Sequence, residues 1–308
     1  MKSIIVDGHE AEDIGLQVQK VLRGLGNPEP PLRLADALEL LRLDRAYYSS
    51  ENQGAIREVV SRLMVAGKQI LERPTLLIDV IRKAKLSALW LPDRKRILID
   101  ESAPKLKHRW NETHEIGHSI IPWHQTFTLG DDEFSLRPES HAQMEAEANF
   151  AAGQLLFLQG RFGDEANDVP FGINAVTTLS GRYGNTITST LWRYVEHAFP
   201  SIPVLGVVSG HPHSPDDQFD PNNPCRHFIE SPLFRQRFSK VSEKYVFRLI
   251  GSYCQLRRGG PLGEADLILA DDNGIRHVFH FESFRIGRHG VLTLGRYLRP
   301  SRVAVAVP

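Results

Sequence analysis

Apolar residues recur three and four positions apart through much of the chain, which is the spacing of an amphipathic helix. This pattern predicts helices over residues 11–25, 32–43, 56–71, 75–84, 107–121 and 141–158. The helix over 107–121 is expected to stop at Pro122, because proline cannot continue the hydrogen-bond ladder of a helix. Residues 173–198 predict two further helices, separated by a turn at Tyr183-Gly184-Asn185.

Shorter apolar runs predict strands. Two of them flank Pro92-Asp93 and predict a hairpin whose second strand ends over 97–99. Residues 265–270 and 276–281 flank the sequence Asp-Asp-Asn-Gly, which is a strong hairpin turn. Residues 303–307 are apolar enough to supply one more strand. Together the predicted helices and strands indicate an α+β fold.

The two ends of the chain differ in charge, although the chain as a whole is neutral. Residues 225–308 contain 14 Lys and Arg against 7 Asp and Glu, whereas residues 1–224 contain 23 against 30. Turn-rich stretches interrupt the chain at 24–31 and 210–224. These breaks predict an N-terminal helical segment at 1–29, a domain at 30–160, a helix-turn-helix-like segment at 161–200 and a basic mixed α/β domain at 201–308.

The composition is that of a globular protein, with 41% hydrophobic and 24% charged residues among 308. Only three apolar residues in a row precede Asp7, which is too short for a secretory signal. No stretch approaches the roughly 18 apolar residues of a membrane helix. Two cysteines, Cys225 and Cys254, are too few for a disulfide framework. We therefore expect a cytoplasmic protein without a membrane segment.

The clearest chemical motif is His114-Glu115-Ile116-Gly117-His118, an HExxH sequence inside the predicted helix 107–121. Residues four apart share one face of a helix, so the imidazoles of His114 and His118 can hold a single zinc ion. Glu115 lies beside them and can act as a general base on a metal-bound water. The motif predicts a metallohydrolase site.

A catalytic zinc site needs a third protein ligand, and the predicted helix 141–158 offers Glu145 and Glu147. Two residues apart on a helix point about 200° apart, so only one of these carboxylates can face the metal. The face of Glu147 carries glutamines and suits solvent, whereas the face of Glu145 carries small and apolar residues. Glu145 is therefore the better ligand, and Asn149, one turn later, can hydrogen-bond a ligating group.

The two motifs together resemble the ImmA/IrrE metallopeptidases, which are zincins of bacteria and phages. The matching residues are HEIGH at 114–118 and Glu145-Ala-Glu-Ala-Asn149, leading to Ala152 and Leu155-Leu156. The resemblance covers roughly residues 30–200 and implies a zincin-like peptidase unit, with His114, His118 and Glu145 as metal ligands and Glu115 as general base. Ala151 stands where the family has Phe, and Phe157-Leu158 replace Met-Pro. These departures concern helix packing more than metal binding.

The resemblance also implies a function and a mode of control. It implies cleavage of a protein substrate, such as a helix-turn-helix transcriptional repressor, in a stress or mobile-element response. By analogy with family members, the C-terminal domain would sense a signal and regulate the peptidase. His124 and His141 are candidates for stabilising the oxyanion, although a histidine in such a position is more often a surface residue.

Residues 173–198 resemble a helix-turn-helix. The side chains that would contact DNA are Thr186, Thr188, Ser189, Arg193 and Arg182. Since the segment is not strongly basic, a structural or partner-binding helix pair is favoured over DNA binding.

A zinc-dependent endopeptidase is the leading functional hypothesis, and two alternatives remain open. One is a DNA-binding regulatory protein that keeps a structural metal site and works through its basic C-terminal third. The other is a module whose proteolysis starts only in a complex with a partner. A set of two histidines and one glutamate suits Zn²⁺, and Mn²⁺ or Fe²⁺ can also occupy it.

Overall fold

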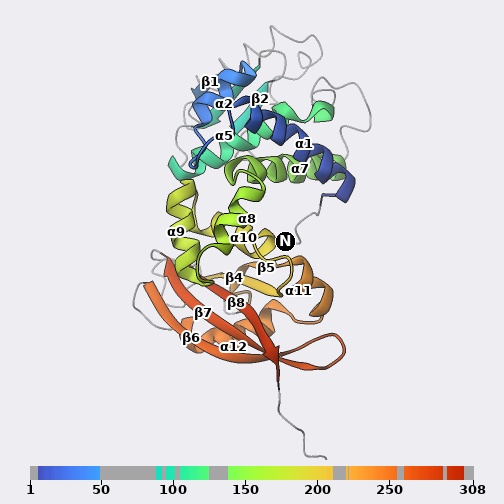
Figure 1. The fold of residues 1–308 in the computed structure, drawn as a ribbon, viewed down its shortest axis with the longest axis vertical. Helices are drawn as coiled ribbons and strands as arrows, with labels where there is room; N and C mark the ends of the chain where they lie inside the picture. The colour runs from blue at the N-terminus through green and yellow to red at the C-terminus, as the bar shows by residue number, and fades with distance from the viewer. Residues whose placement is uncertain are drawn as a thin grey trace, which may run out of the picture. The chain divides into compact units, whose positions relative to one another are not determined.

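The computed structural model describes residues 6–48, 88–91, 95–100, 105–124, 138–210, 220, 222–254, 260–286 and 290–301. The chain divides into an N-terminal unit, Lys2–Gln159, and a C-terminal unit, Gly160–Pro308 (Figure 1). Helices accompany a three-stranded sheet in the first unit and a five-stranded sheet in the second, so the fold is α+β, as predicted. The finer division into four parts stays a prediction.

The N-terminal unit is mainly helical. Its elements are α1 (Gly8–Gly24), α2 (Leu34–Leu41), β1 (Asp44–Tyr48), β2 (Ala88–Leu91), β3 (Arg96–Asp100), α5 (Lys105–Ile120) and α7 (Pro138–Leu156). The helices predicted over 11–25, 32–43, 107–121 and 141–158 are thereby confirmed, with ends that differ by a few residues. Those predicted over 56–71 and 75–84 lie outside the described residues.

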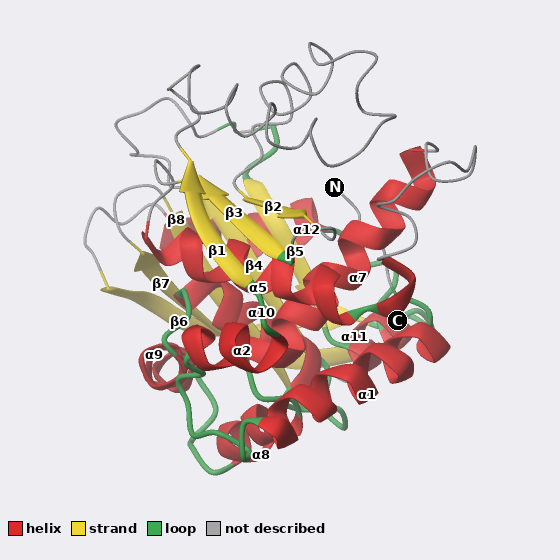
Figure 2. Cartoon of the chain, turned by 90° about the horizontal axis from the view of Figure 1, so that it is seen from above, coloured by secondary structure: helices red, strands yellow, loops and turns green. Residues whose placement is uncertain are grey.

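The three strands of this unit form a sheet in the order β1-β3-β2, which Figure 2 shows side by side. β2 and β3 pair antiparallel, which confirms the hairpin predicted around Pro92-Asp93, and β1 runs parallel to β3. Ile97 and Ile99 are two apart on β3 and therefore point to the same face, where both are fully buried. α5 packs against this sheet.

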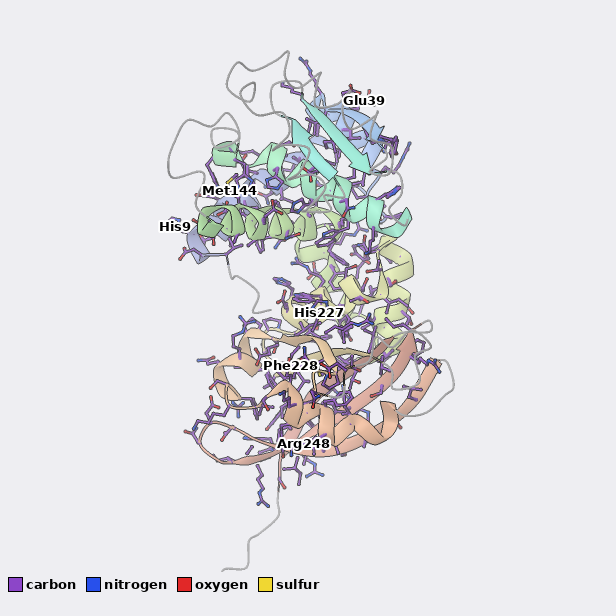
Figure 3. The ribbon with its side chains drawn as sticks, turned by 180° about the vertical axis from the view of Figure 1, so that it is seen from behind. His9, Glu39, Met144, His227, Phe228 and Arg248 are labelled. Atoms are coloured by element: carbon purple, nitrogen blue, oxygen red, sulfur yellow. The ribbon has the colours of Figure 1, made fainter. Side chains whose placement is uncertain are left out.

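α7 packs against both α5 and α1. α1 begins at an N-cap, Asp7, whose side chain accepts a hydrogen bond from the backbone N–H of His9. Near this end of α1, Gln143 Nε2 of α7 donates to Oε2 of Glu10 at 2.9 Å. Figure 3 labels the chain neighbours of this pair, His9 and Met144. α7 therefore contacts α5 on one side and α1 on another.

The C-terminal unit begins with helices and ends with long strands. Its elements are α8 (Gly160–Asn167), α9 (Ile173–Tyr183), α10 (Ile187–His197), β4 (Val204–Gly210), β5 (Cys225–Glu230), α11 (Pro232–Arg237), α12 (Glu243–Cys254), β6 (Gly260–Ala270), β7 (Arg276–Ile286) and β8 (Gly290–Pro300). The strands pair antiparallel in the order β5-β4-β8-β7-β6. The hairpin predicted over 265–281 is confirmed as β6 and β7, and residues 303–307 lie outside the described residues.

Helices cover both faces of this sheet. Leu205 and Val207 of β4 belong to a core cluster with Phe234 of α11 and with Val246 of α12. Figure 3 labels Phe228 of β5, which packs against this cluster, and its neighbour His227, whose ring contacts Trp192 of α10. Because both faces are covered, every residue of β4 is buried, which is why the strand has no polar alternation.

None of the described helices combines the length and the apolar character needed to cross a membrane.

Candidate metal centre

Two helices of the N-terminal unit bring three side chains that could bind a metal to one point. His114 and His118 lie one turn apart on α5, and Glu145 comes from α7. Nε2 of His114 lies 3.1 Å from Nε2 of His118 and 3.2 Å from Oε2 of Glu145. Nε2 of His118 lies 3.5 Å from Oε1 of the same carboxylate. Within the described part of the chain, these three residues are the group whose ligand atoms could hold a metal ion.

The spacing of these atoms fits a divalent cation. Zinc lies about 2.0–2.2 Å from histidine nitrogen and carboxylate oxygen, so ligand atoms of a tetrahedral site are roughly 3.3–3.6 Å apart. The three separations here, 3.1, 3.2 and 3.5 Å, are close to that value. The group has three members among the described residues, as in catalytic sites that keep one position open. The side chain of Glu145 is 42% exposed, so solvent reaches the site.

The second ring nitrogen of each histidine also has a neighbour. Nδ1 of His114 lies 3.1 Å from Oδ1 of Asn149, the residue that the sequence predicts as a hydrogen-bond partner of a ligand. An amide oxygen only accepts, so Nδ1 of His114 donates this hydrogen bond, and Nε2 can supply its lone pair when a cation binds. Nδ1 of His118 lies 2.9 Å from Nδ1 of His124. Both imidazoles are thus oriented with Nε2 toward Glu145.

Two side chains beside the site differ from their prediction. Glu147, expected to face solvent, is only 3% exposed, and its Oε2 accepts a hydrogen bond from Trp123 Nε1 and lies 2.9 Å from His124 Nε2. His124, expected at the surface, is 1% exposed. The cause is the short helical turn at residues 122–124, which brings Trp123 and His124 to α7.

The position of His124 does not suit an oxyanion stabiliser. Its two ring nitrogens face His118 and Glu147 rather than an open site. The side chain of His141, the other candidate, lies outside the described residues. A signal for the contact between His124 and Glu147 was present in the sequence, since a Trp-His dipeptide follows two residues after the helix that carries HExxH.

Burial and neighbouring charges determine the protonation states of His114, His118 and Glu145. Burial lowers the pKa of His118 to about 4, with repulsion from His114 and His124 contributing and the hydrogen bond to Glu145 opposing. Burial acts the same way on His114, but Glu145, Glu115 and Asn149 outweigh it and raise the pKa of His114. Burial would raise the pKa of Glu145, yet hydrogen bonds from both histidines hold it well below its usual range. At neutral pH the carboxylate is therefore ionised and His118 neutral, the forms that bind metals.

Glu115 and Glu112 are the other acidic residues of this part of α5, and both are buried. The negative charge of Glu115 contributes to the raised pKa of His114, so the general-base candidate lies close to the ligands. Glu112 accepts a hydrogen bond from Nη1 of Arg45 at 2.8 Å. This ion pair links the middle of α5 to β1.

Small residues let α5 and α7 approach each other at the site. Gly117, Ala148 and Ala151 are all buried there. Ala151 is one of the positions at which the sequence differs from the ImmA/IrrE pattern, and its Cβ lies 3.3 Å from the point a Cβ at Gly117 would occupy. A larger side chain would not fit in the space between these residues.

The helix-turn-helix-like segment forms α9 and α10, with Gly184 in the left-handed conformation (φ 64°) between them. Most of the side chains proposed to contact DNA instead make contacts within the protein. Thr186 caps α10 and bonds Ser189, Arg193 is buried, and Arg182 forms a two-bond ion pair with Glu165. α10 packs against β4 and β5. These contacts suit a structural helix pair.

Comparisons with known proteins are sparse. No protein-family model matches the chain, and no curated protein matches it, so the ImmA/IrrE resemblance rests on the two motifs. A solved structure of a Mycobacterium tuberculosis transcriptional regulator is similar in fold, with a TM-score of 0.53 and 12% sequence identity. The match covers 94% of this chain and 76% of the other. At this identity the similarity shows a shared fold and nothing about the site.

Proposed function

We propose that this protein is a metal-dependent endopeptidase that cleaves a protein substrate, with zinc as its metal. The observation that carries the proposal is the convergence of His114, His118 and Glu145 at separations suited to one cation. The partial exposure of Glu145 and the three-member ligand set favour a catalytic over a purely structural site. The resemblance of the two motifs to the ImmA/IrrE family supports peptide bonds as the target.

The residues have separable roles in this proposal. His114 and His118 would supply Nε2 and Glu145 a carboxylate oxygen to the cation. A cation bound there would polarise the substrate carbonyl and acidify nearby water. Glu115 would accept a proton from water as its oxygen bonds to the carbonyl carbon. When the C–N bond breaks, the same carboxyl group would return that proton to the leaving nitrogen.

For the substrate, we propose a transcriptional repressor, whose cleavage would relieve repression in a stress or mobile-element response. The motif resemblance is the support for this choice. The basic C-terminal domain predicted at 201–308 would then act as the regulatory part that decides when cleavage occurs.

A regulatory protein with a structural metal site is the second candidate. The similarity in fold to a transcriptional regulator favours it. Under that proposal the Glu115→Gln variant would keep full function, and the arginine-rich C-terminal third, residues 225–308, would carry it. A partner-activated peptidase is a variant of the first proposal, in which cleavage appears only after the partner is added.

The test compares zinc-loaded wild type with zinc-loaded Glu115→Gln on purified helix-turn-helix repressors and on an unfolded polypeptide such as casein. Mass spectrometry then locates any new termini. Endopeptidase activity predicts cuts that appear with wild type and disappear with Glu115→Gln, although both proteins hold the metal. Equal fragmentation by the two proteins would contradict it. Intact substrates with a zinc-loaded wild type would exclude a constitutive peptidase and favour the partner-activated peptidase or the regulatory protein.

A further inference from the structure

A buried chain of hydrogen-bonding groups extends from His118 away from the candidate metal centre. His124 Nδ1 lies 2.9 Å from His118 Nδ1, and His124 Nε2 lies 2.9 Å from Glu147 Oε2. Trp123 Nε1 donates to the same carboxylate oxygen. His124 and Glu147 are 1% and 3% exposed, so water does not replace these contacts. We refer to His118, His124 and Glu147 as the relay.

The chemistry of the groups fixes the direction of every hydrogen bond once His118 binds a metal. A neutral imidazole has one N–H and one lone pair. If Nε2 of His118 gives its lone pair to the cation, Nδ1 carries the proton and donates it to Nδ1 of His124. His124 must then hold its own proton on Nε2, and that proton points at the Glu147 carboxylate. Each donor in the relay meets an acceptor.

The opposite direction prevents metal binding. If Nδ1 of His124 donated to His118, then Nε2 of His118 would carry the proton and have no lone pair for a cation. The Glu147 carboxylate works against this direction, because it accepts from Nε2 of His124 and leaves Nδ1 of a neutral His124 as an acceptor. Trp123, which also donates to Glu147, helps to keep the carboxylate in place.

We propose that His124 and Glu147 are positioning residues of the metal centre, which act through His118 by fixing its tautomer and ring orientation. This inference rests on the proposed metal-dependent function. It gives α7 two roles: Glu145 faces the cation directly, while Glu147, two residues later, reaches the site through His124. His114 is held differently, since its Nδ1 partner is Asn149, a neutral and exposed amide. The buried, charged relay therefore makes His118 the more firmly oriented histidine.

The test measures zinc affinity by chelator competition and the visible spectrum of the Co²⁺-loaded protein in four variants. His124→Leu removes the acceptor of the His118 proton, and outer-shell losses of this kind weaken metal binding by about 10–100-fold. His124→Asn places an amide oxygen near the position of Nδ1 and is expected to restore most of the affinity. Glu147→Gln keeps an acceptor without the charge, so a smaller loss is expected. His277→Leu is the matched control, because His277 is also buried and pairs with a carboxylate, Asp271, at 3.0 Å in the C-terminal unit.

The inference is supported if zinc affinity falls from wild type to His124→Asn and falls further in His124→Leu. His277→Leu should bind zinc as tightly as wild type, and the Co²⁺ bands of His124→Leu should differ from those of wild type. Zinc affinity of His124→Leu within twofold of wild type would overturn the inference, as would equal losses in the Leu and Asn variants. If His124→Leu does not fold, Glu147→Gln decides: an affinity and Co²⁺ spectrum like wild type would count against the relay. A wild type that binds no metal would instead overturn the proposed function itself.

Discussion

The carbonyl oxygen of Ala148 lies 2.8 Å from the point that a Cβ atom would occupy at Gly117. Because the obstacle is backbone, it cannot rotate away, and only glycine permits α5 and α7 to approach this closely. Gly117 directly precedes the candidate ligand His118, and Ala148 is one turn beyond the candidate ligand Glu145. The glycine therefore sets the distance between the two helices that carry the candidate metal ligands.

Replacing this glycine tests that relationship. Gly117→Ala should push α5 away from α7, lower the free energy of unfolding by about 1–3 kcal/mol and weaken zinc binding. Gly153→Ala is the matched control, since a Cβ at Gly153 of α7 meets nothing within 4 Å. That variant should gain roughly 0.5–1 kcal/mol from helix propensity and bind zinc as wild type does. Urea unfolding and chelator competition measure both effects, and identical behaviour of the two variants would refute the argument.

The helices that carry the site could be predicted from sequence because their signals are local. Apolar spacing gave α5 and α7, and the opposed faces of α7 distinguished Glu145 from Glu147. The same reasoning failed for the burial of Glu147, because the groups that bury it, Trp123 and His124, belong to another segment. A prediction of exposure from the faces of one helix uses only that helix's own residues, whereas burial depends on what packs against them.

The strands of the C-terminal unit were harder to predict for a related reason. β4 is buried on both faces, so its sequence lacks the alternation that identifies a half-exposed strand. The hairpin of β6 and β7 was predictable because its turn is local. There, Asp271 Oδ1 accepts hydrogen bonds from the backbone N–H groups of Asn273 and Ile275, and Gly274 has φ 81°.

A second close approach in the C-terminal unit gives another prediction. A Cβ at Gly295 of β8 would lie 2.6 Å from Cε1 of Phe281, the residue opposite it on β7. Phe281 is buried in the core cluster, so its ring cannot easily move. Gly295→Ala should therefore lower the free energy of unfolding by about 1–3 kcal/mol. Adding Phe281→Leu should recover part of this loss. If the double variant instead loses the sum of the two single-variant free energies, the two residues do not interact as described.

The ion pairs of Glu165 give a prediction about acid stability. Hydrogen bonds from Arg182 and Arg161 lower the pKa of Glu165 from 4.5 to about 2. Because the pKa is lower in the folded than in the unfolded chain, the carboxylate stabilises fully above pH 4.5, and this stabilisation disappears as the pH falls toward 2.

The measurement is the melting temperature of wild type and Glu165→Gln between pH 7 and pH 3. An exposed pair of this kind contributes about 1 kcal/mol, so the variant should melt about 2–4 °C lower at pH 7. The difference should shrink as the pH falls below 4.5, and Arg182→Gln should behave in the same way. A difference that stays constant down to pH 3 would show that the ion pairs are not its source.

We propose that His114, His118 and Glu145 together hold one catalytic metal ion. Elemental analysis of the purified, zinc-loaded protein tests it most directly, with His114→Ala, His118→Ala and Glu145→Ala beside wild type. Glu115→Gln is the control, because it changes the proposed general base and leaves the three candidate ligands in place. About one zinc per chain is expected in wild type and in Glu115→Gln, and the three variants at the candidate ligands should lose it. A wild type that cannot be loaded, or a Glu145→Ala variant that holds zinc as tightly as wild type, would contradict it.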